Sequence, residues 1–193
     1  IIWTYIKLMD DVNKIKFVII GYEKTGKTLF TQYLDEGNSF LDFNNYHPTN
    51  GASYISRKYN YENIEYTLDV WDTSGEQKYR ALTKFFIRDA HILLIFFNYN
   101  DRRSFEDAKQ LVQFGKVESD NNKVACVLVG SKYDLELEQK TMDIVNEEEV
   151  LDFVGIYNIP YAHISIKEKY SNGVNELLNK AFKEYVKTIK NSK

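Results

Sequence analysis

Cysteine is nearly absent from this 193-residue chain, which contains only Cys126. A single cysteine cannot form an internal disulfide, and Cys126 lies in the apolar run VACVLVG, where a small buried side chain is expected. The chain therefore has no disulfide framework of the kind that stabilises small secreted domains. We expect a reducing, cytoplasmic setting.

Long hydrophobic runs are absent as well. The longest apolar stretches, such as ILLIFF, are far shorter than the roughly 20 residues that span a bilayer. The opening IIWTYIKLM is interrupted by Lys7 and has no small-residue cleavage site, so it is a poor match to a signal peptide. Position 1 is not methionine, and we expect a piece of a longer protein in which residues 1–13 are an N-terminal extension.

The chain has no strong excess of one charge. Its 25 Lys and Arg residues stand against 28 Asp and Glu residues, which gives a formal net charge of -3. A general affinity for polyanions is not implied, so we do not expect nucleic acid as a partner. With 44% hydrophobic and 27% charged residues, and without repeats or low-complexity segments, the chain has the composition and length of one folded domain.

Strand and helix patterns alternate along the chain. Short apolar or alternating segments predict strands at 14–21, 52–59, 64–72, 91–97 and 124–130, with a hairpin turn in YENIE between the second and the third. Strands that are apolar throughout are typical of parallel sheets buried on both faces. The prediction is an α/β fold with a mostly parallel sheet, helices on both faces, and a ligand site at the carboxyl ends of the strands.

Helix signals lie between and after these strands. The segment 28–34 has helical spacing. Two residue pairs are typical of helix N-caps: Ser104 with Asp107, and Asn146 with Glu149. The last helix is expected to bury one face of hydrophobic residues: Val174, Leu177, Leu178, Phe182, Tyr185, Val186 and Ile189.

The strongest motif is GYEKTGKT, Gly21 to Thr28, which directly follows the first strand and precedes a helix. Successive backbone N–H groups in such a loop can surround phosphate groups, aided by the positive end of the helix. Lys27 would reach the β- and γ-phosphates, and the Thr28 hydroxyl would bind Mg²⁺. The alternative is a glycine-containing loop that matches by chance, and the strand–loop–helix context argues against it.

Two further elements follow in chain order. Asp72 and Gly75 stand at the end of a strand, where a carboxylate can hold Mg²⁺ and a glycine N–H can contact a γ-phosphate. The motif SKYD, Ser131 to Asp134, follows a buried strand. Its Asp carboxylate can accept hydrogen bonds from guanine N1–H and N2–H₂ together, a pair of donors that adenine does not offer. Each motif alone is a common turn, and only their order and spacing give them meaning.

Together these elements resemble the Ras superfamily of small GTPases, and the Rab branch in particular, over residues 14–190. The segments WDTSGEQKYRALT, FFIRDA, FNYND and YAHISIK are similar to Rab segments in order and spacing. The resemblance implies a single small-GTPase domain at 14–190, with a six-stranded sheet that has one antiparallel hairpin strand at its edge. It also implies bound GTP or GDP with Mg²⁺, hydrolysis of GTP, and a switch function in vesicle or membrane trafficking.

The resemblance assigns roles to individual residues. For nucleotide binding it implies Gly21, Glu23, Lys24, Thr25, Gly26, Lys27, Thr28, Leu29, Phe40, Thr49, Gly75, Ser131, Lys132, Asp134, Ser165, Ile166 and Lys167, with Phe43 as a rival of Phe40. For Mg²⁺ it implies Thr28, Thr49 and Asp72, and for catalysis Lys27, Thr49, Gly75, Glu76 and Gln77. Tyr54, Trp71 and Phe86 match the aromatic triad that Rabs present to effectors, although ordinary core or sheet-face packing is the alternative.

Some residues at the phosphate end depart from the family pattern. Glu76 stands where the family has the water-orienting glutamine, and Gln77 is available only if the loop shifts by one residue. A carboxylate is repelled by a γ-phosphate but can accept a proton from water, so we expect hydrolysis that is altered in rate or in its response to activating proteins. Glu23 and Lys24 replace usually small residues, and we expect them to tune binding rather than to block it.

Other departures affect the base and the loop before Thr49. Ser131 replaces the family's asparagine, which predicts weaker nucleotide retention with guanine preference kept through Asp134. The segment from Lys27 to Thr49 is a few residues longer than usual, which leaves Phe43 as an alternative to Phe40.

The resemblance also implies partners and a location. Exchange factors, activating proteins and effectors are expected for a monomeric protein, and hydrolysis should be slow without an activating protein. The chain ends in KNSK without the cysteines that Rabs prenylate, so either the tail 191–193 is truncated or the protein is not prenylated. With a lipidated tail, a cytoplasmic protein would associate peripherally with the cytosolic face of an endomembrane. The rivals are a GTP-binding adaptor that no longer cycles and, more distantly, a P-loop kinase.

Overall fold

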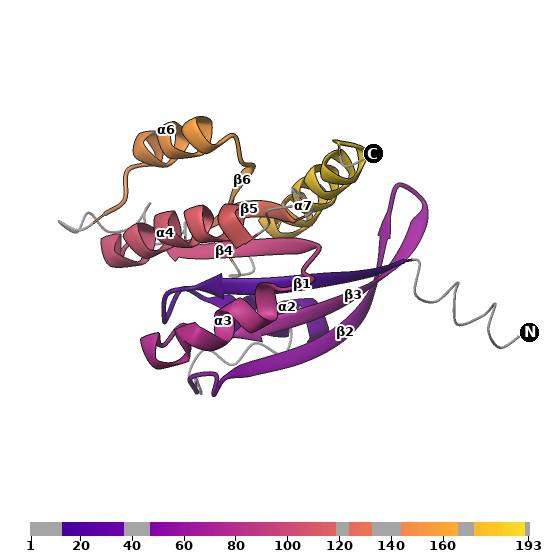
Figure 1. The fold of residues 1–193 in the computed structure, drawn as a ribbon, viewed down its shortest axis with the longest axis horizontal. Helices are drawn as coiled ribbons and strands as arrows, with labels where there is room; N and C mark the ends of the chain where they lie inside the picture. The colour runs from indigo at the N-terminus through magenta and orange to yellow at the C-terminus, as the bar shows by residue number, and fades with distance from the viewer. Residues whose placement is uncertain (1–12, 37–46, 119–123, 133–143, 166–171, 192–193) are drawn as a thin grey trace, which may run out of the picture.

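The computed structural model describes residues 13–36, 47–118, 124–132, 144–165 and 172–191 (Figure 1). The strands are β1 (Lys14–Gly21), β2 (Ala52–Tyr61), β3 (Ile64–Thr73), β4 (Ile92–Asn98), β5 (Ala125–Ser131) and β6 (Tyr161–Ile164). The helices are α2 (Lys27–Glu36), α3 (Arg80–Ile87), α4 (Arg102–Glu118), α6 (Glu147–Tyr157) and α7 (Asn172–Asn191), with the short 3-10 helix η2 (Gln77–Tyr79) before α3.

All six strands form one sheet in the order β2-β3-β1-β4-β5-β6. Only the edge pair β2 and β3 is antiparallel, and every other neighbouring pair is parallel. The predicted α/β fold, with its antiparallel hairpin strand at the edge, is therefore confirmed. In the strand register Gly21 lies beside Phe96, and Ser131 lies beside Asn98 and Ile164. The carboxyl ends of the five parallel strands β3, β1, β4, β5 and β6 thus meet at one edge.

Helices cover both faces of the sheet, and each strand of its centre sends alternate side chains to the two faces. In β1, Ile15, Phe17 and Ile19 belong to the core cluster under α2 and α7. Val18 and Ile20 belong to the cluster under α3, α4 and α6. Burial on both faces explains why these strands are apolar almost throughout.

The β2–β3 hairpin turns through two residues in the left-handed backbone region, Glu62 (φ 50°) and Asn63 (φ 62°). This two-residue turn matches the twist of the flanking strands and was predicted from YENIE. The hairpin is fixed to α7 by Phe182, whose ring lies 4.9–5.2 Å, centroid to centroid, from three hairpin rings: Tyr59, Tyr61 and Tyr66.

One of the two predicted helix caps is confirmed. The Asn146 side chain accepts a hydrogen bond from the backbone N–H of Glu148 at the start of α6 (3.0 Å). The prediction for Ser104 was wrong, because α4 begins before it and Ser104 is buried with its hydroxyl on the Asp101 carbonyl. The carboxylate of Asp101 accepts from the N–H of Arg103 (3.1 Å) and acts as the cap instead.

The predicted apolar face of α7 is confirmed over its first half. Val174, Leu177, Leu178 and Phe182 are buried against the sheet, but Ile189 is 39% exposed. With 20 residues, α7 is far longer than the four-residue β6 beside it, so its last turns have no strand to cover. None of the helices in the described parts of the chain is long and apolar enough to cross a membrane.

Candidate functional site

The loop between β1 and α2 has a backbone that few residues can adopt. Gly21 has a φ of 144°, Lys24 of 59° and Gly26 of 87°. A Cβ at Gly21 would lie 2.2 Å from the carbonyl oxygen of Phe96, so only glycine fits where the loop crosses β4. The loop leads directly into the N-terminus of α2, whose unpaired N–H groups and positive dipole end favour an anion.

Lys27 lies across this loop and is 5% exposed. Its Nζ donates to the carbonyl oxygens of Gly21 (2.9 Å) and Tyr22 (2.7 Å). Burial lowers the pKa of Lys27 to about 8, and the carboxylates of Asp72, Asp107 and Glu23 oppose that shift. A poorly solvated ammonium beside a helix N-terminus is well placed to bind a phosphate oxygen.

Thr28, Thr49 and Asp72 meet at one point. The hydroxyls of Thr28 and Thr49 lie 2.8 Å apart, although 21 residues separate them in the sequence. Both hydroxyls also reach Asp72 Oδ2, Thr28 at 2.8 Å and Thr49 at 3.2 Å. Burial raises the pKa of the Asp72 carboxyl, and the hydrogen bonds from the two threonines oppose the shift. The structure therefore brings together all three residues predicted to bind the metal.

The donor set of this cluster fits Mg²⁺. Asp72 Oδ1 is buried and accepts no hydrogen bond, which is costly for a carboxylate oxygen unless a cation uses it. One carboxylate and two hydroxyls are hard oxygen ligands, and Mg²⁺ commonly adds phosphate oxygens and waters to a few protein ligands of this kind. The described residues contain no group of three His, Cys, Asp or Glu side chains, so a metal held by protein carboxylates alone finds no site among them.

Gly75 lies directly against the loop between β1 and α2, which we refer to as the phosphate loop. A Cβ at Gly75 would be 2.4 Å from the backbone nitrogen of Glu23, so a larger residue would force the two segments apart. The next side chain, Glu76, is 27% exposed and forms an ion pair with Lys78 Nζ (2.8 Å). Gln77 is exposed and begins η2. Glu76 is therefore already engaged with a cation beside the loop.

The unusual residues of the phosphate loop are directed toward solvent. Glu23 and Lys24 are both exposed, so neither charge is buried in the loop. Thr25 is buried and donates a hydrogen bond to the carbonyl of Tyr22 (2.8 Å), while Leu29 is half-buried in the first turn of α2. Lys24 holds a left-handed φ that a side chain adopts at some cost, which a glycine would avoid.

Three of the residues predicted to contact the base lie within the described part of the chain: Ser131, Lys132 and Ser165. Ser131 is buried at the end of β5, and its hydroxyl donates to the carbonyl of Phe97 (2.8 Å). Lys132 follows with a φ of 58°, and Ser165 is buried after β6 at the same edge of the sheet. The remaining predicted base contacts lie outside the described residues: Phe40, its rival Phe43, Asp134, Ile166 and Lys167.

We expect Ser131→Asn to slow the release of bound GDP. The Ser131 hydroxyl donates to the carbonyl of Phe97. The Cβ of Ser131 lies 4.0 Å from the position that a Cβ on Gly26 would take. The longer amide of asparagine would therefore reach the phosphate loop. One added neutral hydrogen bond is worth about 1 kcal/mol, or roughly fivefold slower release. The dissociation rate of a fluorescent GDP analogue measures the effect. Ser131→Ala is the control, and a Ser131→Asn rate equal to wild type would contradict the prediction.

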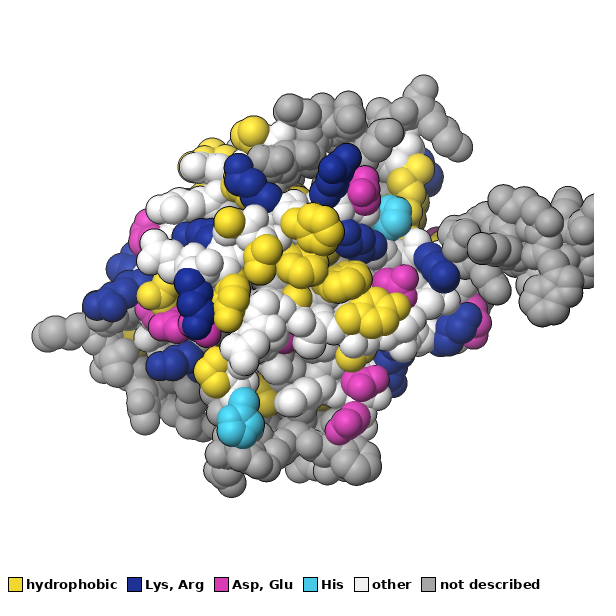
Figure 2. Space-filling view, turned by 60° about the horizontal axis from the view of Figure 1, so that its bottom comes forward, with side chains coloured by type: hydrophobic (Ala, Val, Ile, Leu, Met, Phe, Trp, Pro, Cys, Tyr) yellow, Lys and Arg dark blue, Asp and Glu magenta, His cyan; other side chains and the backbone are white. Residues whose placement is uncertain are grey.

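The three aromatic residues predicted as an effector surface form a contiguous row. Ring centroids of Tyr54 and Trp71 lie 5.0 Å apart, and those of Trp71 and Phe86 lie 5.4 Å apart. Tyr54 is 49% exposed, whereas Trp71 and Phe86 also pack against the core. Figure 2 brings forward the bottom of Figure 1, where β2, β3 and α3 lie. Hydrophobic side chains gather near the middle of this face. The row is part of both a surface and the core. The alternative to an effector surface, ordinary core or sheet-face packing, therefore also fits it.

Two interactions that hold the site together were not anticipated. Thr73 Oγ1 donates to the carbonyl of Ile19 (2.8 Å) and fixes the end of β3 beside the phosphate loop. Because Thr73 directly follows the predicted strand 64–72, its place was within reach of sequence reasoning. Arg80 pairs with Asp107 and joins α3 to α4. Side chains 27 residues apart on separate helices carry no such signal in the sequence.

A mostly parallel sheet whose first strand turns through a glycine loop into a helix, with a lysine lying across that loop, defines the P-loop class of nucleotide-binding proteins. Within that class the chain belongs to the Ras family, whose sequence model matches residues 16–191.

Known relatives narrow the assignment. The chain is 28% identical over 170 residues to the Ras-related protein Rab-17 of Mus musculus, covering 88% of this chain and 74% of the relative. It is 29% identical over 161 residues to the Ras-related protein Rab7 of Cenchrus ciliaris (80% and 74%). It is 29% identical over 160 residues to the Ras-related protein RABG3e of Arabidopsis thaliana (79% and 74%). The predicted likeness to the Rab branch is therefore confirmed, and the chain is a Rab-like small GTPase of the Ras superfamily.

Proposed function

We propose that the chain is a molecular switch that binds GTP and GDP with Mg²⁺ and hydrolyses GTP. The observation that carries the proposal is the meeting of Thr28, Thr49 and Asp72 at one carboxylate oxygen. Thr49 reaches this point from the segment ahead of β2, so its position responds to whatever Thr28 and Asp72 bind. That response is what distinguishes a switch from a simple nucleotide site.

The phosphate loop would bind and orient the nucleotide. Lys27 would exchange its bonds to loop carbonyls for bonds to phosphate oxygens, and the Gly75 N–H would contact the terminal phosphate. Thr28, Thr49 and Asp72 would hold Mg²⁺, which when bound supplies a Lewis acid that neutralises charge on the β- and γ-phosphate oxygens. Glu76 or Gln77 would orient the attacking water.

Guanine selectivity is assigned to residues at the ends of β5 and β6. Asp134 would accept from the guanine base, and Lys132 would lie along it. Phe40 would stack on the edge of the base, and Ser165, Ile166 and Lys167 would support it through backbone donors. Ser131, held on Phe97, would contribute less than the family's asparagine.

The likeness to Rab proteins supports a role in vesicle or membrane trafficking. We propose residues 14–190 as one small-GTPase domain that acts as a monomer, with exchange factors, activating proteins and effectors as partners. Tyr54, Trp71 and Phe86 would present the effector surface. A cytoplasmic protein held peripherally on the cytosolic face of an endomembrane is the corresponding location.

The proposal is tested by loading the protein with GTP and Mg²⁺ and chromatographing the bound nucleotide over several hours. Conversion of GTP to GDP supports a cycling switch. GTP that stays bound and intact would favour the second candidate, a non-cycling adaptor, which the Glu76–Lys78 ion pair makes worth testing. Failure to retain any guanine nucleotide would contradict both.

Glu76→Gln is expected to speed single-turnover hydrolysis of GTP. The substitution removes a carboxylate beside the γ-phosphate and releases Lys78, and loss of one like-charge contact near a protein surface is worth roughly tenfold in rate. The measurement is phosphate release from preloaded protein, with and without an activating protein. Lys78→Gln is the matched control, because it breaks the ion pair and keeps Glu76. Unchanged rates in Glu76→Gln under both conditions would rule out a role for this side chain.

A further inference from the structure

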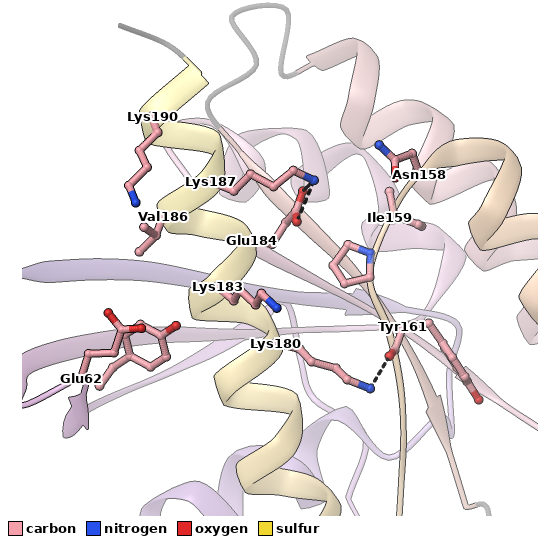
Figure 3. Close-up of a pocket in the computed structure, with 12 residues that line it drawn as sticks. Glu62, Asn158, Ile159, Tyr161, Lys180, Lys183, Glu184, Val186, Lys187 and Lys190 are labelled. Atoms are coloured by element: carbon pink, nitrogen blue, oxygen red, sulfur yellow. Dashed lines mark hydrogen bonds and ion pairs between the residues drawn. The ribbon is translucent and has the colours of Figure 1, made fainter.

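A cavity of about 760 Å³ opens at the end of the sheet opposite the phosphate loop (Figure 3). Three elements line this open cavity: the turn of the β2–β3 hairpin, the residues that lead into β6, and the outer half of α7. Tyr161, the first residue of β6, lines the cavity, so the cavity lies at the amino end of this strand. The phosphate loop follows the last residue of β1 and lies at the carboxyl end of the sheet. The volume is in the range of sites that hold a small-molecule ligand.

Four lysines of α7 line this cavity: Lys180, Lys183, Lys187 and Lys190. Their spacing places them on one face of the helix, along a row about 15 Å long. Figure 3 shows this row along α7, with Ile159 and Tyr161 across from it. Among the described residues, Glu62 and Glu184 are the two carboxylates that line the same cavity. The lining is therefore locally positive in a chain whose formal net charge is -3. We refer to this cavity and its four lysines as the lysine pocket.

The four lysines differ in how far they are already engaged. Lys180 pairs with Glu176 (2.7 Å) and donates to the carbonyl of Tyr161 (3.0 Å), which fixes it at the rim. Lys187 has only a long contact of 3.4 Å with Glu184. Lys183 and Lys190 are exposed and make no hydrogen bond or ion pair with the residues that the structure describes. Two ammonium groups are thus free to bind a ligand, and a third is loosely held.

The wall that faces the lysines is largely apolar. Ile159 is 9% exposed, and Pro160, which follows it in the chain, also lines the cavity. Lysines on a helix surface usually extend into solvent, with nothing opposite them. Here Ile159 and Tyr161 lie across from them (Figure 3), so the lysines border a hollow rather than open solvent. The Asn158 side chain lines the same wall and adds an amide donor.

We propose that the lysine pocket binds a compact ligand that carries two or more phosphate groups. Lysine binds phosphate as a point charge, and several lysines along one row suit several phosphates on one scaffold. The ligand is either a free polyphosphorylated small molecule or the phosphorylated headgroup of a membrane lipid, which share this chemistry. The inference is independent of the nucleotide site, because the pocket and the phosphate loop lie at opposite ends of the sheet.

The test uses protein saturated with GDP and Mg²⁺, so that the phosphate loop is occupied. Calorimetric titration with inositol 1,4,5-trisphosphate tests the free ligand. Cosedimentation with phosphatidylcholine vesicles that contain phosphatidylinositol 4,5-bisphosphate tests the headgroup, against vesicles of equal charge made with phosphatidylserine. Binding to the trisphosphate indicates a soluble source. Binding to the bisphosphate vesicles alone indicates a lipid source.

Matched variants locate the binding site. Lys183→Ala combined with Lys190→Ala is expected to weaken binding about tenfold, since each lysine near a phosphate surface contributes measurably. Glu62→Gln is expected to tighten binding, because it removes a carboxylate from the pocket. Lys58→Ala is the control, since Lys58 lies on β2 outside the pocket with 63% of its side chain exposed. Circular dichroism melting curves identify any variant that fails to fold.

Three results would overturn the proposal. The first is no binding to either phosphorylated probe. The second is equal binding to phosphatidylserine and bisphosphate vesicles with no binding of the trisphosphate, which would show attraction to charge alone. The third is unchanged binding in the folded double lysine variant. None of these results bears on the GTP-loading experiment. Rejection of the proposed ligand of the lysine pocket is therefore distinguishable from rejection of the proposed switch function.

Discussion

Asp72→Asn is expected to accelerate the release of GDP in the presence of Mg²⁺ by about a hundredfold or more, since loss of even an outer-shell partner weakens a metal site by 10- to 100-fold. Asp72 is the one carboxylate in the cluster with Thr28 and Thr49, and both hydroxyls converge on its Oδ2. An amide of the same size keeps the shape of the site and removes its charge. Stopped-flow release of a fluorescent GDP analogue, with and without chelator, measures the effect.

The same substitution is expected to stabilise the nucleotide-free protein. Burial disfavours the charged form of Asp72, and its Oδ1 has no hydrogen-bond partner, so a neutral amide removes a desolvation cost of about 1–3 kcal/mol. The melting temperature measured in the absence of nucleotide and Mg²⁺ should rise by a few degrees. Asp69→Asn is the matched control, because Asp69 lies on the same strand but accepts from Tyr54 and Ser56 at the surface. Release of GDP as slow as in wild type would contradict the proposal that Asp72 helps to hold Mg²⁺.

Phe182→Ala is expected to lower the free energy of unfolding by about 4 kcal/mol. The side chain is fully buried, and its ring lies 5.9 Å from that of Phe17 in β1 as well as against the hairpin tyrosines. Removal of the ring leaves a cavity and frees the β2–β3 hairpin from α7. Urea unfolding followed by circular dichroism measures the loss.

The position of Phe182 allows a control and a second readout. Val186→Ala, one turn further along α7 and only partly buried, should cost far less. Limited proteolysis should cut Phe182→Ala within the β2–β3 hairpin before it cuts elsewhere, because the hairpin loses its contacts with α7. A Phe182→Ala variant as stable as Val186→Ala would show that the surrounding rings close over the gap.

The positions of most strands and the place of the site at their carboxyl ends were predictable because they depend on local patterns. Strands such as β4 and β5 are apolar on both faces, so a mostly parallel sheet follows from the sequence. The hairpin turn was also predicted, but its place at the edge of the sheet was expected only from the resemblance to Rab proteins. Thr28 and Asp72 are close in space because they follow or end neighbouring strands. Thr49 is different: its place at the cluster was expected only from the resemblance to Rab proteins.

Other features depend on side-chain reach and were beyond sequence reasoning. The cap of α4 is Asp101 rather than Ser104, a difference that depends on where the helix begins after β4. Ile189 continues the apolar spacing of α7 into turns that no strand covers. Glu76 stands where the family has a glutamine, which is visible in the sequence, but its ion pair with Lys78 is not. The pair matters because a cation beside the carboxylate offsets part of its negative charge.

The row of Tyr54, Trp71 and Phe86 beside the Thr28–Thr49–Asp72 cluster gives the protein its own optical reporter. Trp71 is one of two tryptophans in the chain, lies directly before Asp72, and packs between the rings of Tyr54 and Phe86. Its emission wavelength depends on how much water reaches the indole ring, so rearrangement around Asp72 would shift its fluorescence. With Trp3 replaced by phenylalanine, the spectrum would come from Trp71 alone, and the exchange of nucleotides would be visible in real time without an attached dye.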